Sequence, residues 1–224
     1  MNSVKQMLHD INADVKYTRS MTGKEKLKDE IMTALSKVPR DAFVPANLKS
    51  MAYQNSPLPI GHGQTISQPY IVALMTDLLD IKSDHVILEV GTGSGYQTAI
   101  LSLLCKQVYT IELVSELSAL AKKRFNELHY DNIEAFTGNG YNGYPEHAPY
   151  DGIIVTAAAT HIPEPLVTQL KPGGKLIIPV GLSGMHQELM VLEKALDNET
   201  HVQSILGVVF VPLINESLEN KNME

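Results

Sequence analysis

The sequence predicts a doubly wound α/β fold, in which helices cover both faces of a mostly parallel sheet. Three observations lead to this prediction. Short runs rich in Val, Ile and Leu alternate with segments of helical periodicity through the middle of the chain. The first of these runs, residues 86–90, is followed by glycines at alternate positions, Gly91, Gly93 and Gly95. Towards the C-terminal end the pattern changes to two strands joined by a short polar turn, which is typical of an antiparallel hairpin at a sheet edge.

The N-terminal part predicts helices and loops before the first strand of the sheet. Residues 1–20 show no strong period. Residues 22–25 have the Ser/Thr-x-x-Glu form of a capping box, and apolar residues at helical spacing then predict a helix that is ended by Pro39. Residues 39–60 hold four prolines and predict an ordered loop that packs on the main domain. A second helix is predicted over residues 68–79.

From residue 85 onwards, strands and helices alternate. The predicted strands of the parallel region are 85–90, 107–111, 133–136, 151–156 and 175–180. The predicted helices between them are 96–104, 115–129 and 164–170. The strands 188–194 and 202–211, separated by a turn at Asp197-Asn198, complete the sheet as the edge hairpin. We therefore expect three regions, which are an N-terminal extension packed on the core (1–60), the core (61–214) and a disordered tail (215–224).

Composition and charge narrow the classes of function. The 224 residues carry a net charge of −7, which does not favour nucleic acid as a partner. Cys105 is the only cysteine, so an internal disulfide is impossible, and we expect a buried thiol in a cytoplasmic protein. The eight histidines show no ligand spacing, and therefore no metal site is predicted. The chain has no run of 18 apolar residues, so we expect no membrane association.

The glycine loop predicts a nucleotide cofactor. A dinucleotide fingerprint has the spacing G-x-G-x-x-G, whereas residues 91–95 read G-x-G-x-G, which is more typical of methyltransferases that bind S-adenosylmethionine. Glu89 lies two residues before the first glycine. Glu112 ends the next apolar run, 21 residues after Gly91, and an acid at this distance is placed to bind two ribose hydroxyls. The same residues are also compatible with a plain strand-to-helix turn and a solvated acid.

Five collinear segments between residues 20 and 214 carry a resemblance to a known family. They are Val38-Pro39-Arg40-Asp41-Ala42-Phe43-Val44-Pro45, residues 61–70, the glycine loop, residues 150–180 and Phe210-Val211-Pro212-Leu213. Together they resemble the protein-L-isoaspartate O-methyltransferase family. The glycine loop is shared by many methyltransferases, whereas Gly-Gln-Thr-Ile-Ser at residues 63–67 is close to family-specific.

The resemblance implies a fold, a cofactor and a reaction. The fold would be the Rossmann-like methyltransferase type with about seven strands. The cofactor would be S-adenosylmethionine, and its methyl group would pass to the free carboxylate of L-isoaspartyl residues in damaged proteins and peptides. The ester would then close to a succinimide, which reopens in part to normal aspartate. Isoaspartyl proteins and peptides are the implied partners. The oligomeric state is left open, with a monomer as the simplest expectation.

The resemblance also implies the site residues. Ser67 would supply the catalytic hydroxyl, although Ser67 before Gln68-Pro69 also predicts a helix N-cap, and the two roles are compatible. The expected cofactor-binding residues are Glu89, Gly91, Thr92, Gly93, Gly95, Glu112, Asn139 and Gly140. The expected substrate-binding residues are Thr65, Ile66, Ala157, Ala158, Val211 and Leu213. Glu89 would meet the methionyl ammonium, and the two alanines would lie beside the sulfonium.

Three positions depart from the family pattern. Asn139 stands where Asp is usual, which removes a charge from the expected adenine contact. His161 replaces a proline-rich turn, and Val208-Val209 occupies a place where Arg is common, which puts the peptide contacts in question. Three other functions therefore stay open. They are a methyltransferase for another small carboxylate or metabolite, a non-catalytic isoaspartyl-binding module and, against the glycine spacing, a nicotinamide oxidoreductase.

Overall fold

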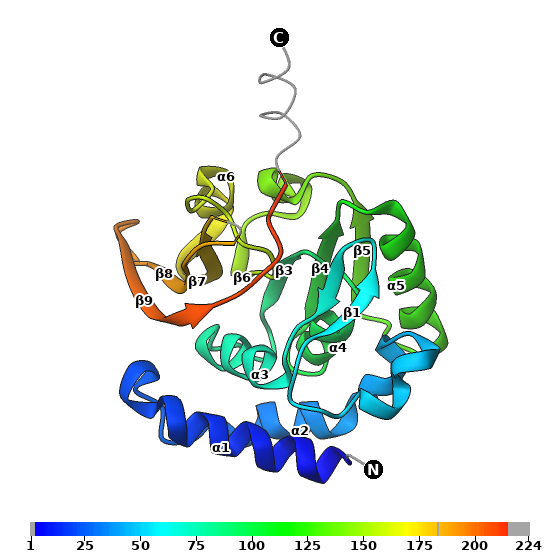
Figure 1. Cartoon of the computed structure of the whole chain (residues 1–224). Coiled ribbons are helices and arrows are strands. Elements are labelled where there is room, and N and C mark those ends of the chain that lie inside the picture. Colours follow the sequence, from blue (N-terminus) through cyan, green and yellow to red (C-terminus); the bar gives the residue numbers. More distant parts are fainter. Residues whose placement is uncertain (1–2, 183, 215–224) are drawn as a thin grey trace.

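A seven-stranded sheet forms the centre of the computed structural model, which describes residues 3–182 and 184–214 (Figure 1). Its strands are β3 (Val86–Val90), β4 (Gln107–Glu112), β5 (Ile133–Thr137), β6 (Tyr150–Val155), β7 (Leu170–Gly181), β8 (Gln187–Lys194) and β9 (Thr200–Val208). The spatial order is β5-β4-β3-β6-β7-β8-β9, with β3 to β7 parallel and the last two strands antiparallel. The predicted fold class, including the edge hairpin, is confirmed.

The strand order places the functional site. The chain runs outwards from β3 to β5, then returns to the other side of β3 to form β6. The connections after β3 and β6 therefore leave in opposite directions, and a crevice opens between them at the carboxyl ends of the strands. Ligands of open α/β sheets bind at such a switch point. The glycine loop, which directly follows β3, lies there.

Strands β3 and β6 place apolar side chains on both faces of the sheet, because both faces are buried there. Ile87 and Ile154 belong to one hydrophobic cluster, whereas their neighbours Leu88 and Ile153 belong to the cluster on the opposite face. The first cluster also takes residues from α3 (Pro69–Leu78), α4 (Tyr96–Ser102) and α5 (Ser115–Glu127). The second is covered by the short helix α6 (Glu164–Thr168) through Leu166. All four helices were predicted, with ends that differ by a few residues.

The N-terminal region contains a helix that the sequence did not predict. Helix α1 spans Val4–Thr22, with Met7, Ile11 and Val15 buried at intervals of four residues. The expected capping box is wrong. Thr22 is the last residue of α1, and Gly23, at φ 67°, is its left-handed C-cap. The next helix, α2, begins only at Asp29 and ends at Lys37.

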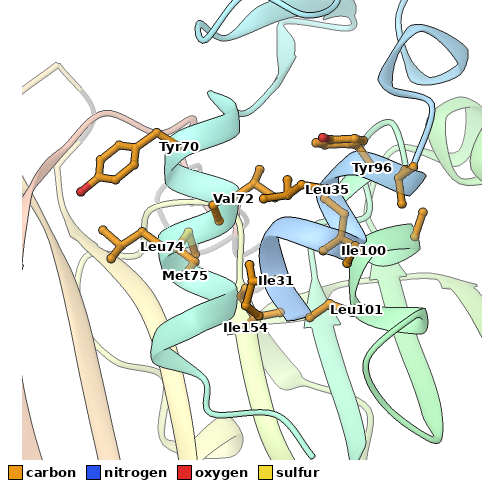
Figure 2. Packing of buried hydrophobic residues seen from close by; sticks show 14 of the residues in the cluster. Ile31, Leu35, Tyr70, Val72, Leu74, Met75, Tyr96, Ile100, Leu101 and Ile154 are labelled. Atoms are coloured by element: carbon orange, nitrogen blue, oxygen red, sulfur yellow. The ribbon is translucent and has the colours of Figure 1, made fainter. Parts of the chain in front are cut away.

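Helix α2 packs its apolar face against the main domain. Ile31 and Leu35 point towards Val72 of α3 and towards α4, as Figure 2 shows. Ile154 of the central strand β6 belongs to the same cluster. The N-terminal helices therefore share a continuous hydrophobic core with the sheet.

Residues 39–66 are more regular than the predicted loop. They form two 3₁₀ helices, η1 (Arg40–Phe43) and η2 (Ala46–Met51), and a short hairpin of β1 (Leu58–Gly61) and β2 (Gln64–Ile66). His62 connects these strands at φ 53°, between two glycines that also have positive φ. The hairpin leads directly into the segment before α3.

The C-terminal end crosses back over the sheet. Strand β9 ends at Val208 rather than at the predicted residue 211. Residues 209–214, which we call the strap, then run from this edge towards β6 (Figure 1). The predicted tail at 215–224 lies outside the described residues. Among the described helices, none is long and apolar enough to cross a membrane.

Candidate active site at the switch point

The three glycines of the loop are required for different reasons. All three have positive φ, at 95°, 52° and 89° for Gly91, Gly93 and Gly95. A Cβ atom on Gly91 would lie 2.4 Å from Thr156 Oγ1, and one on Gly95 would lie 2.6 Å from the Phe125 ring. At Gly93 the nearest heavy atom is 3.6 Å away. The first and third glycines are therefore required by packing, whereas the second leaves open space beside the loop.

Glu112 holds the loop from the end of β4. Its Oε2 accepts a hydrogen bond from Gly93 N at 2.8 Å, and its Oε1 accepts one from Val114 N at 3.0 Å. The side chain is mostly buried. The carboxylate thus lies beside the glycine loop, and its expected contact with ribose hydroxyls stays a prediction.

Glu89 lies beneath the loop and is fully buried. Its Oε2 accepts hydrogen bonds from Thr98 Oγ1 at 2.5 Å and Thr110 Oγ1 at 2.7 Å. Thr110 Oγ1 is also 2.7 Å from Thr92 Oγ1, so a chain of hydroxyls connects Glu89 to the glycine loop. Burial raises the pKa of Glu89 to about 8, which favours the neutral acid at pH 7.

A first cleft opens in front of the loop, with an empty volume of about 820 Å³ that includes the part open to solvent. Many of the predicted site residues line it, and these are Thr65, Ile66, Ser67, Gly91, Thr92, Gly93, Glu112, Gly140, Ala157, Val211 and Leu213. Glu89, Gly95, Asn139 and Ala158 are not among its lining residues. Asn139 instead caps the turn η3 (Gly140–Asn142), because its Oδ1 accepts a hydrogen bond from Tyr141 N.

A second cleft adjoins the first. It lies between the segment before α3, the start of β8 and the strap, with an empty volume of about 1090 Å³ including open solvent. Thr65, Ser67, Thr156 and Val211 line both clefts. Two ligands bound in the two clefts would therefore meet at these four residues. Val208, one of the departures from the family pattern, lies on the wall of the second cleft.

The predicted capping role of Ser67 is wrong. Gln68 occupies the N-cap position of α3, with Pro69 as the first helical residue. The backbone N–H of Tyr70 finds its partner outside the helix, because it donates a hydrogen bond to Asn55 Oδ1 at 3.0 Å. Ser67 therefore lies one residue before the cap, and its side chain does not hold the start of the helix.

Arg40 fixes Ser67 from behind. This arginine is completely buried, and its Nη2 donates a hydrogen bond to the Ser67 carbonyl oxygen at 2.9 Å. Its Nε donates to the Ala52 carbonyl oxygen at 2.8 Å, and the guanidinium carbon lies 4.7 Å from the ring centroid of Tyr96. Burial lowers the pKa of Arg40, whose charge is stabilised by the carbonyls and the aromatic face.

Sequence reasoning missed the role of two residues at this site. Arg40 belongs to a segment that carried the family resemblance, and its place in that segment was the available signal. Thr156 follows β6 and donates a hydrogen bond to the Gly91 carbonyl oxygen at 2.6 Å. A strand-end threonine gave no signal of its own. Among the described residues, no group of three or more His, Cys, Asp or Glu side chains is arranged to hold a metal ion.

Solved structures identify the class of protein. One described as a protein-L-isoaspartate O-methyltransferase superposes with a TM-score of 0.84 at 26% identity, covering 99% of this chain and 69% of the other. A second, from Plasmodium falciparum, has a TM-score of 0.75 at 26% identity, covers 92% and 97% of the two chains and contains S-adenosyl-L-homocysteine. The fold and the glycine-loop site define an S-adenosylmethionine-dependent methyltransferase.

Sequence relatives then give the family. A relative from a Polaromonas species, named protein-L-isoaspartate O-methyltransferase 2, is 54% identical over 94% of this chain and 100% of its own length. One of the same name from Nitrosococcus oceani is 54% identical over 95% and 97% of the two chains. The model of the protein-L-isoaspartate(D-aspartate) O-methyltransferase family matches residues 18–218. The chain belongs to this family, and the alternative of a nicotinamide oxidoreductase is thereby overturned.

Alanine at two glycines should separate binding from folding. We expect Gly93→Ala to cost about 1–2 kcal/mol of stability through its left-handed φ and to raise the Kd for S-adenosylmethionine about tenfold or more, because the new methyl group occupies open space at the loop. Gly95→Ala should cost about 2–4 kcal/mol, because its Cβ meets the Phe125 ring. Urea denaturation and calorimetric titration measure the two effects. Unchanged cofactor affinity in folded Gly93→Ala would contradict this view of the loop.

The raised pKa of Glu89 predicts a pH-dependent stability. Its folded pKa of about 8 exceeds the reference value of 4.5. The contribution of Glu89 to stability is therefore fully present below pH 4.5. It is lost as the pH rises from 4.5 through 8, because over that range the unfolded state ionises before the folded state does. Glu89→Gln removes the titration and keeps an oxygen that accepts from the threonines. The free energy of unfolding of the variant relative to the parent should therefore rise between pH 5 and pH 8.5. Exposed Glu199→Gln is the control, and a flat difference for Glu89→Gln would disprove the assignment.

Proposed function

We propose that the chain transfers the methyl group of S-adenosylmethionine to the free carboxylate of L-isoaspartyl residues, with the cofactor in the first cleft and the peptide in the second. The observation that carries this proposal is the boundary between the clefts. Thr65, Ser67, Thr156 and Val211 face both of them. A donor and an acceptor held on either side of these residues are brought together for transfer. The reaction starts repair, because the ester closes to a succinimide.

The residues of the first cleft fit this cofactor. Gly93 leaves open space at the loop. Glu112 accepts two backbone hydrogen bonds, and its carboxylate has further lone pairs for ribose hydroxyls. Glu89 supports the cofactor loop indirectly, because Thr110 connects its carboxyl group to Thr92 of the loop. Its contact with the methionyl ammonium stays a prediction. Gly140 lines the end of the cleft where the adenine is expected.

The methyl transfer requires no general base from the protein. S-adenosylmethionine supplies an electrophilic methyl group on a sulfonium. The acceptor is a carboxylate with an ordinary pKa of about 3.9, so it is already ionised at pH 7 and no general base is needed. The protein has to align the two reactants and exclude water, and such alignment contributes roughly 7–11 kcal/mol to lowering a barrier. The small side chain of buried Ala157, which lines the first cleft, leaves room for the two reactants at the boundary between the clefts.

Ser67 is the residue that we propose to orient the acceptor. Its carbonyl is tied to Arg40, and its side chain is free of the capping role that local sequence suggested. A hydroxyl at this position donates a hydrogen bond to the isoaspartyl carboxylate and points one of its oxygens towards the first cleft. Thr65 and Ile66 line the same place.

The setting of the reaction is also part of the proposal. We place the protein in the cytoplasm as a monomer that does not depend on nucleic acid. The net charge of −7 supports the absence of a phosphate-binding role. The single cysteine, Cys105, is a buried thiol whose pKa is raised to about 12, as expected of a structural residue in a reducing compartment.

Acceptor choice tests the proposal directly. The purified chain is given radiolabelled S-adenosylmethionine and two peptides that differ only in an isoaspartyl or an aspartyl residue. We expect base-labile label on the isoaspartyl peptide alone. Label on neither peptide, with the cofactor bound, would favour another acceptor or a binding-only protein. Equal labelling would exclude specificity for isoaspartate.

Ser67→Ala should separate chemistry from cofactor binding. A hydrogen bond to a charged group contributes about 1.5–3 kcal/mol, so kcat/KM for the isoaspartyl peptide should fall by about 10- to 100-fold. The Kd for S-adenosylmethionine should stay within about twofold of the parent value, because the Arg40 bond to the backbone is retained. Ser36→Ala, which removes an exposed hydroxyl of α2, is the matched control. Unchanged turnover in Ser67→Ala would remove this serine from the mechanism.

A further inference from the structure

The strap forms a wall of both clefts and is anchored at its far end by Ala158, in the segment that follows β6. Ala158 N donates a hydrogen bond to the Val211 carbonyl oxygen at 2.8 Å, and Leu213 N donates to the Ala158 carbonyl oxygen at 2.8 Å. Val211 lines both clefts, whereas Val209 and Phe210 line only the second. The position of Phe210 therefore affects the second cleft more directly than the first.

A buried glutamine holds the near end of the strap. Gln187, the first residue of β8, is 2% exposed. Its Nε2 donates a hydrogen bond to the Phe210 carbonyl oxygen at 3.1 Å, and its Oε1 accepts one from Phe210 N at 2.6 Å. A primary amide presents a donor and an acceptor side by side, as a peptide group does. The side chain therefore replaces the strand pairing that Phe210 has left.

The place of this contact along the chain matters. The backbone of Gln187 is paired with Val208, the last residue of β9. The side chain then holds Phe210, two residues further on, where the chain turns away from the sheet towards Ala158. Gln187 thus bridges the interval between the end of the β8–β9 ladder and the anchor at Ala158. Gln187 itself lies on the wall of the second cleft.

We propose that Gln187 is a positioning residue for the isoaspartyl substrate, because its side-chain amide holds the strap in place and so sets the width of the second cleft. The inference rests on the proposed function, which places the peptide there. Loss of the amide releases Phe210 while the Ala158 anchor stays. Peptide binding is weakened, whereas the cofactor, held mainly by the glycine loop, is bound as before.

A matched control exists in the same protein. Gln169 is 7% exposed and also holds a backbone segment with both amide atoms. Its Oε1 accepts from Tyr144 N at 2.8 Å, and its Nε2 donates to the Asn142 carbonyl oxygen at 2.8 Å. Neither Asn142 nor Tyr144 is among the residues that line the two clefts. Gln169→Met therefore removes the same hydrogen bonds from a segment away from the peptide.

The experiment compares Gln187→Met with Gln169→Met in the full-length chain. We expect Gln187→Met to raise the KM for an isoaspartyl peptide about tenfold, with kcat and the Kd for S-adenosylmethionine within about threefold of the parent values. Gln169→Met should lower the melting temperature without changing the peptide KM. An equal rise of KM in both variants, or a loss of stability in Gln187→Met with unchanged KM, would overturn the inference.

Two further measurements keep the test decisive. Gln187→Glu keeps the acceptor for Phe210 N and loses the donor to the Phe210 carbonyl oxygen. This variant should therefore also raise the KM for the peptide. It replaces Gln187→Met in the test if that variant does not fold. Hydrogen exchange of the Phe210 amide needs no activity, and it should be slow in the parent and at least about tenfold faster in Gln187→Met, which removes the acceptor of that amide. Fast exchange in the parent would disprove the clamp. Absence of methyl transfer by the parent would instead contradict the proposed function.

Discussion

The buried guanidinium of Arg40 is the interaction on which the acceptor side of the molecule depends. It joins η1 to the carbonyl groups of Ala52, Ser56 and Ser67, which belong to segments with little regular structure. A buried charge is costly unless hydrogen bonds compensate it, and these three carbonyls supply that compensation. Conversely, removal of the arginine side chain would leave the three carbonyls without their donor. The ring of Tyr96 under the guanidinium adds a favourable contact from the other side of the site. The N-terminal region therefore determines the position of Ser67, through the hydrogen bond from Arg40.

The same contact connects the two clefts. Tyr96 is the first residue of α4, directly after the glycine loop, and it lines the first cleft. Arg40 thus touches both the segment that we propose to bind the cofactor and the segment that we propose to face the acceptor. The strand order provides the crevice, and the N-terminal helices provide the support for one of its walls. The region before β3 is therefore part of the architecture of the reaction and shares its core with the sheet (Figure 2).

The sheet was predictable because buried strands leave a clear apolar pattern. The glycine loop directly follows one such strand, and Glu112 is the last residue of another. Local sequence patterns gave wrong helix ends where tertiary contacts determine the end of the helix. Residues 22–25 match a capping box, yet Gly23 ends a helix there, and the buried stripe of α1 is too narrow to give a clear period. Ser67 resembles an N-cap, but the chain enters α3 one residue later. The role of Gln187 was beyond prediction, because its partner Phe210 lies 23 residues away and belongs to no regular element.

The central claim is that the acceptor carboxylate meets the cofactor at the boundary of the two clefts, beside Ser67. A crystal structure of the chain with S-adenosylhomocysteine and an isoaspartyl peptide tests it most directly. We expect the homocysteine sulfur in the first cleft, the peptide in the second, and an isoaspartyl carboxylate oxygen within hydrogen-bond distance of Ser67 Oγ and facing the sulfur. A peptide bound elsewhere, or a carboxylate turned away from the sulfur, would contradict this account.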